Sequence, residues 1–110
     1  MTPPMPKLDL RPEHRAMVHD ILATQIPDRD VVVFGSRARG NAKPHSDLDL
    51  AVLGDDPLGL HKMAELKEAF EESDLPFKVD VVEWAQTDAR FRAVIRRDAV
   101  QVQAASASTP

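Results

Sequence analysis

Apolar residues along this chain recur with two different spacings, and each spacing predicts a kind of element. From Pro12 to Ile26, apolar side chains return every three or four positions, which is the spacing of one helix face. The same spacing recurs over residues 60–70 and 91–95. Proline suits the first turn of a helix, and Thr87 is the expected N-terminal cap of the last one. The pattern therefore predicts three helices.

Three short segments between these helices have the composition of strands. Residues 31–34 form an apolar, β-branched run, and residues 47–53 and 77–82 alternate in polarity. The loop 36–46 contains glycine and proline, with one helical turn expected at residues 37–39. It is too short for a helical crossover, so we expect the first two strands to be antiparallel. The third strand follows a helix and can lie parallel to its neighbour.

Together these elements predict one α/β (α+β) domain: a small mixed sheet with its helices packed on one face. The domain is expected to span residues 11–102, which suits a chain of 110 residues. Residues 1–10 are rich in proline and are expected to be flexible. Residues 103–110 are mostly small and polar and are expected to form a disordered tail.

Composition narrows the class of protein. The net charge of −4 argues against a protein that binds nucleic acid by neutralising its phosphates. The absence of cysteine excludes disulfides and thiolate metal sites. There is neither an apolar run of about 18 residues, as a membrane span requires, nor a signal-peptide pattern. We therefore expect a cytoplasmic protein without a membrane partner.

The candidate chemistry lies at the ends of the first two strands. Gly35 and Ser36 follow the first strand, ten residues separate Ser36 from Asp47, and Asp49 lies two positions further on. Alternate residues of a strand share a face, so the two aspartates can converge on one or two magnesium ions. Asp80 has the same parity on the third strand and can join them if the two strands are neighbours.

The turn after the first strand is the expected phosphate site. Gly35 lets the backbone approach a ligand closely, and Ser36 can donate hydrogen bonds to a terminal phosphate. Arg37 and Arg39 are candidates to neutralise phosphate charge, although one of them could face a partner instead. Asp80 is the candidate to share a metal and to receive the proton of an attacking hydroxyl. Such a site supports phosphoryl or nucleotidyl transfer by in-line displacement.

These residues resemble the polymerase-β-like nucleotidyltransferases, and in particular their minimal (MNT) members. The resemblance covers about residues 12–100 and is carried by Gly35, Ser36, Asp47, Asp49, Asp80 and the run VFGSRARG at 33–40. It implies a nucleotidyltransferase core that uses ATP and Mg²⁺. It also implies an antitoxin that attaches AMP to a tyrosine of a HEPN-family ribonuclease toxin. The chain has no room for an acceptor-binding domain, which favours a protein as the acceptor.

Two other functions remain open on the sequence alone. The chain could neutralise a toxin by occlusion, with a vestigial site. It could also transfer a nucleotide to a small molecule such as an aminoglycoside, in which case a homodimer rather than a hetero-oligomer is expected.

Overall fold

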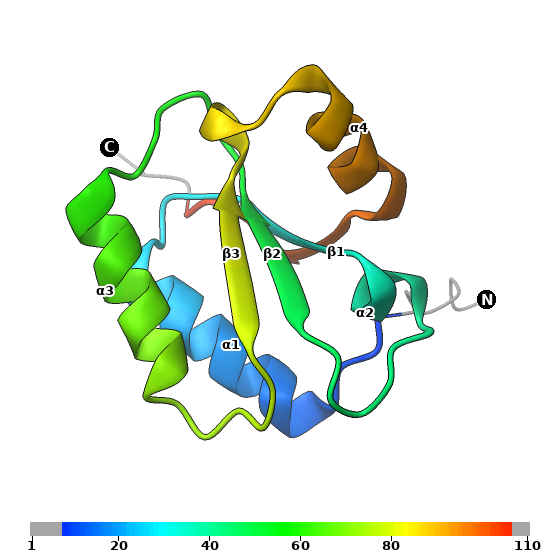
Figure 1. Cartoon of the computed structure of the whole chain (residues 1–110). Coiled ribbons are helices and arrows are strands. Elements are labelled where there is room, and N and C mark those ends of the chain that lie inside the picture. The colour runs from blue at the N-terminus through cyan, green and yellow to red at the C-terminus, as the bar shows by residue number, and fades with distance from the viewer. Residues whose placement is uncertain (1–7, 107–110) are drawn as a thin grey trace.

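The computed structural model describes residues 8–106, and the chain there folds as alternating helices and strands (Figure 1). The predicted order of helices and strands is confirmed up to residue 98. The elements are α1 (Pro12–Gln25), β1 (Val31–Phe34), α2 (Ser36–Arg39), β2 (Leu48–Val52), α3 (Leu60–Glu71), β3 (Val79–Glu83), a 3₁₀ turn η1 (Trp84–Gln86), α4 (Ala89–Asp98) and β4 (Val100–Gln103).

The sheet is mixed, with the strand order β3-β2-β1-β4. Strands β1 and β2 are antiparallel and β2 and β3 are parallel, as predicted. The prediction of three strands is wrong, because β4 pairs antiparallel with β1 at the far edge. Its four residues alternate in polarity as a strand should, but a single residue separates them from α4 and a polar tail follows. Gln103 anchors the strand by donating from its amide to the carbonyls of Ile26 and Arg29.

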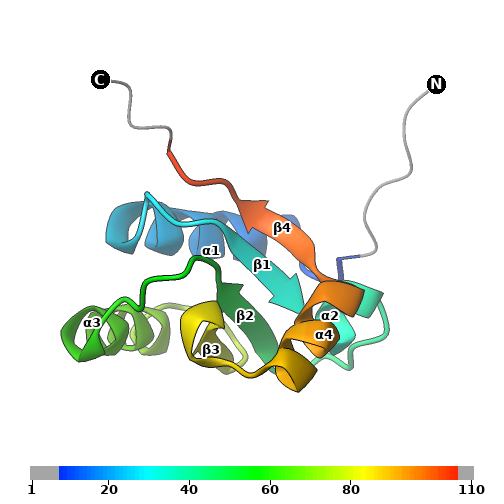
Figure 2. The same ribbon diagram turned by 90° about the horizontal axis from the view of Figure 1, so that it is seen from above.

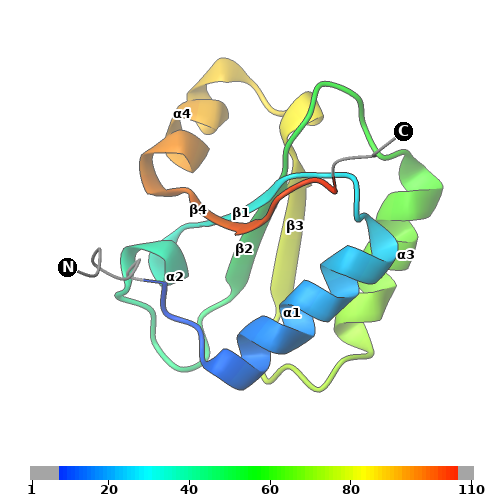
Figure 3. The ribbon, with the colours of Figure 1, turned by 180° about the vertical axis from the view of Figure 1, so that it is seen from behind.

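Helices cover both faces of the sheet, so the expectation that they pack on one face is wrong for α4. The larger apolar cluster joins α1 and α3 to the face that carries Val33 and Leu50. A smaller cluster on the opposite face joins Ile95 of α4 to Val32 and Phe34 of β1. Figure 2 shows α1 and α3 on one side of the sheet and α4 on the other, and Figure 3 shows α1 beside α3. The aspartates thus share their face with a helix.

The folded unit extends beyond the predicted bounds 11–102 on both sides. Leu8 and Leu10 pack against the larger cluster, and the amide of Asp9 donates to the carbonyl of Arg37. At the other end, Gln103 is buried within β4. The predictions for residues 1–7 and 107–110 concern residues outside those that the structure describes. Over residues 8–106, no helix combines the length and the apolar character that crossing a bilayer requires.

One helix cap also differs from the prediction. Asp88, not Thr87, caps α4, and its carboxylate accepts a hydrogen bond from the amide of Phe91. The Thr87 hydroxyl instead donates to the carbonyl of Trp84 and closes the 3₁₀ turn. Aspartate is at least as good an N-cap as threonine, so either neighbour could have served.

Candidate active site

A glycine in a rare backbone conformation ends β1 and begins α2. Gly35 has φ 80° and ψ −158°, a region that is essentially reserved for glycine. A Cβ atom at this position would lie 2.5 Å from Oδ2 of Asp49, a contact that real Cβ atoms do not make. Two constraints therefore require glycine at position 35: the backbone conformation, and the lack of space for a Cβ atom beside the Asp49 carboxylate.

Sheet pairing brings the predicted residues together. In the antiparallel register Phe34 lies opposite Asp49, which places the Gly35 turn against that aspartate. In the parallel register Asp49 lies opposite Asp80. Neighbouring strands of a sheet lie about 4.7–4.9 Å apart, and side chains in register point to the same face. The two carboxylates therefore form a pair across β2 and β3, as the strand parity predicted.

The surroundings of Asp49 disfavour the ionised form of its carboxyl. The pKa of Asp49 is raised, first by burial of its carboxyl and then by the negative charges of Asp80 and Asp47. Asp47 comes immediately before β2 and is exposed, and Asp80 is exposed as well. A cation bound beside Asp49 would offset the negative charge that disfavours ionisation of its carboxyl.

This donor set fits a divalent cation such as Mg²⁺. Magnesium prefers one or two carboxylates together with substrate phosphate oxygens to an all-protein cage. Within residues 8–106, no three carboxylate or imidazole side chains form a ready-made cation site. Asp47, Asp49 and Asp80 remain the residues predicted to hold such an ion, and Ser36, at the start of α2, remains the residue predicted to face the phosphates.

Arg37 does not occupy the phosphate position predicted for it. Its guanidinium is buried and donates hydrogen bonds to the carbonyls of Asp9, Pro44 and Ser46. It also lies over the ring of Phe77, at 4.1 Å from the centroid. The structure therefore assigns Arg37 to holding the loop 41–46, which enters β2 at the aspartates. Its proximity to Ser36 in the sequence made it a candidate, but its burial could not be read from the motif.

Arg39 lies at the surface and pairs with an acid that the sequence analysis did not single out. Its Nη1 atom is 2.9 Å from Oδ2 of Asp98, whose side chain is only 5% exposed. The neighbouring Arg97 also bonds Asp98, and this hydrogen bond is the main cause of the lowered pKa of the carboxyl. An acid in the last turn of a helix opposes the helix dipole, a signal that could have marked Asp98 in the sequence. The pair ties the end of α2 to the end of α4.

Comparison with known proteins identifies the family of this chain. The sequence model of the family "Polymerase beta, Nucleotidyltransferase" matches residues 18–106, which include Gly35, the three aspartates and β4. This chain belongs to that family. The nucleotidyltransferase fold and enzyme class expected from the motif are thereby confirmed.

Individual relatives show which members of the nucleotidyltransferase family this chain is similar to. The Haemophilus influenzae protein named "Probable protein adenylyltransferase MntA" is 47% identical over 97 residues, covering 88% of this chain and 85% of the relative. A solved minimal nucleotidyltransferase is 36% identical with a TM-score of 0.64, over 78% of this chain and 89% of that one. A chain from a toxin–antitoxin crystal structure with AMP-PNP is 25% identical with a TM-score of 0.69, over 82% of this chain and 73% of that one. The resemblance to minimal nucleotidyltransferases is confirmed.

Proposed function

We propose that this nucleotidyltransferase is an antitoxin that transfers AMP from ATP to a hydroxyl group, expected to be a tyrosine, of a HEPN-family toxin. The observation that carries the proposal is the Asp49–Asp80 pair facing the Gly35 turn, in a chain similar to a named protein adenylyltransferase. The AMP-PNP toxin–antitoxin structure supports ATP as the substrate and a toxin as the partner. We expect the reaction to take place in the cytoplasm.

The chain's own residues position and polarise the reactants. Ser36 and the backbone at Gly35 hold the terminal phosphates of ATP, so that the α-phosphorus lies near Asp47 and Asp49. A bound Mg²⁺ would neutralise triphosphate charge and stabilise the charge that develops on the leaving group. The acceptor oxygen forms a bond to the α-phosphorus while the bond from that phosphorus to the bridging oxygen breaks, releasing pyrophosphate.

Asp80 is the proposed acceptor of the proton from the attacking hydroxyl. It lies on the outermost strand, with Asp49 on its inner side, so an acceptor approaches it from the edge of the sheet. A base must come within hydrogen-bond reach of the proton that it removes. Asp80 is exposed, which is compatible with a large acceptor such as a protein side chain.

The proposal is tested by supplying labelled ATP, Mg²⁺ and the HEPN-family protein to the purified chain. We expect label on the partner with the wild type and none with the double variant Asp47→Asn/Asp49→Asn. A charge-matched control is available in Asp55→Asn/Asp56→Asn, which removes two exposed acids from the turn after β2 and should leave transfer intact. Protection of cells by the Asp47→Asn/Asp49→Asn variant, with no label transferred by the wild type, would instead indicate neutralisation by occlusion.

A small-molecule acceptor is separated from a protein acceptor by pyrophosphate release. Release in the absence of any partner protein, on addition of an aminoglycoside, would contradict the proposed acceptor while leaving the nucleotidyl-transfer chemistry in place. Dependence on Mg²⁺ is read from the same assay after chelation, where we expect transfer to stop and to return when Mg²⁺ is added back.

A further inference from the structure

Strand β3 leaves one side of its backbone without a neighbouring strand. Within residues 8–106 it is an outer strand, paired with β2 alone. The amide of Leu48 donates to the carbonyl of Lys78, which sets the phase of the parallel ladder. Backbone groups of successive residues point to alternate sides, so those of Asp80 face β2 and those of Val79 and Val81 face outward. Outward-facing amides and carbonyls are a template for pairing with another chain.

Two cavities lie along this same edge, between β3 and α3. The upper one has a volume of about 530 Å³ and includes Met63, Val81 and Glu83 in its lining. The lower one has a volume of about 440 Å³ and includes Phe70 and Val79 in its lining. Lys67 lines both cavities, so they adjoin at this side chain. A groove therefore follows the whole of β3, a length of about 16 Å for five residues.

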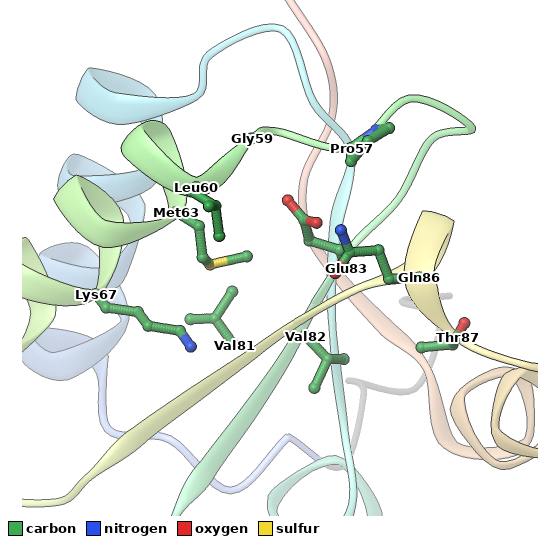
Figure 4. A pocket seen from close by; sticks show the side chains of 10 residues that line it. All are labelled: Pro57, Gly59, Leu60, Met63, Lys67, Val81, Val82, Glu83, Gln86 and Thr87. Atoms are coloured by element: carbon green, nitrogen blue, oxygen red, sulfur yellow. The ribbon is translucent and has the colours of Figure 1, made fainter.

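The upper end of the groove has an apolar rim. Figure 4 shows Leu60 and Met63 of α3 facing Val81 across the cavity, with Lys67 reaching toward β3. Leu60 is 94% exposed, and among the described residues no other large apolar side chain is as open to solvent. With Met63 and Val81, Leu60 gives the upper cavity an apolar wall, which a side chain of a bound partner can cover.

We propose that this groove binds an extended segment of the partner polypeptide as an additional strand next to β3. Its backbone pairs with the outward groups of Val79 and Val81, and its alternate side chains enter the two cavities. An extended chain fits better than a helix, because a helix has already used its backbone groups internally. Asp80 is also among the residues that line the lower cavity. Side chains of a bound strand alternate between the two faces of the sheet, so those that do not enter the cavities lie on the face of Asp80, where a hydroxyl group can reach the proposed base.

The inference rests on the proposed function for its choice of partner, and its test reads docking separately from chemistry. In the complex with the HEPN-family protein, we expect the exchange of the Val79 and Val81 amide protons to slow by at least tenfold. Val79→Pro removes one outward donor at the first residue of an edge strand, a position that tolerates proline. We expect it to raise KM for the partner about tenfold, with kcat and KM for ATP unchanged.

A second variant guards against misfolding of the proline variant. Lys67→Glu reverses the charge between the cavities and should raise KM for the partner. Lys62→Glu makes the same change on the same helix outside both cavities and should not. One result would overturn the inference and leave the proposed function standing. In it the wild type transfers AMP, but amide exchange at Val79 and Val81 does not slow in the complex, and KM for the partner is unchanged in Val79→Pro and Lys67→Glu. Slowed exchange without any transfer by the wild type would support the groove and refute the proposed function.

Discussion

Replacing Gly35 by alanine tests whether the turn and the aspartate are built around each other. The added methyl group would lie 2.5 Å from Oδ2 of Asp49, so the carboxylate must rotate away. The side chain moves more easily than the backbone, because only its far end is in contact. We therefore expect Asp49 to leave the position in which it can share a cation with Asp80.

The cost to stability follows from the backbone. A residue with a side chain held at φ 80° and ψ −158° costs about 1–3 kcal/mol. For a domain of this size, a loss of about 2 kcal/mol lowers the melting midpoint by about 10 °C. We expect the cost to nucleotide binding to be larger, because the displaced carboxylate is lost from the proposed metal–nucleotide site altogether. We expect affinity for AMP-PNP with Mg²⁺ to fall by at least tenfold.

Gly59 provides a matched control. Its φ of 91° and ψ of 157° place it in the same region of backbone space. An alanine there would meet nothing within 4 Å. Gly59→Ala should therefore lose a similar amount of stability while binding Mg²⁺ and AMP-PNP normally.

Thermal unfolding and isothermal calorimetry with AMP-PNP and Mg²⁺ separate the two effects. If Gly35→Ala and Gly59→Ala lose stability equally and both retain nucleotide affinity, the close approach of Gly35 to Asp49 does not shape the site. If only Gly35→Ala loses nucleotide affinity, the close approach of Gly35 to Asp49 does shape the site.

Three further predictions use the charged residues around the site. Asp49→Asn removes a carboxyl whose pKa is raised in the fold, so the variant should be more stable than the wild type at pH 7 without Mg²⁺; this difference should vanish in melting curves below the ordinary pKa of aspartate, about 3.9. Arg37→Lys gathers all donors on one nitrogen, which cannot reproduce the bonds that the planar guanidinium makes from Nε, Nη1 and Nη2, and it should cost about 2 kcal/mol in urea unfolding. Amide exchange should also quicken in the loop 41–46, whereas unchanged exchange there would refute the anchoring role of Arg37. Asp98→Asn should be less stable than the wild type at neutral pH, because the pKa of Asp98 is lowered in the fold; melting curves should converge as the pH falls through that lowered value, and a constant gap would exclude the ionised pair as the cause.

The strand parity of the aspartates could be predicted because it depends only on local alternation. Leu48 and Leu50 commit one face of β2 to the core, which forces Asp49 to the other. The parallel pairing with β3 then followed from the intervening helix. The motif residues that gather, Gly35, Asp49 and Asp80, are those whose positions depend on backbone geometry alone.

The features that sequence reasoning missed depend on tertiary contacts. The role of Arg37 is decided by carbonyls from the N-terminal segment and the loop, which no spacing rule brings near it. The far placement of α4 depends on a second apolar face of β1, where Val32 and Phe34 meet Ile95. In β1 every residue is apolar, so both of its faces can be buried. Such a strand does not indicate which face a later helix will cover.

The pairing of Phe34 with Asp49 has a consequence for how the site assembles during folding. The turn that ends β1 and the start of β2 come together when the β1–β2 hairpin closes. Arg37 holds this hairpin by donating a hydrogen bond to the carbonyl of Ser46. Asp80 reaches the same place only after α3 has formed and β3 has added to the sheet. Contacts close in sequence form faster than distant ones. We therefore expect the β1–β2 hairpin, which brings Gly35 to Asp49, to form earlier in folding than the β2–β3 pairing that adds Asp80.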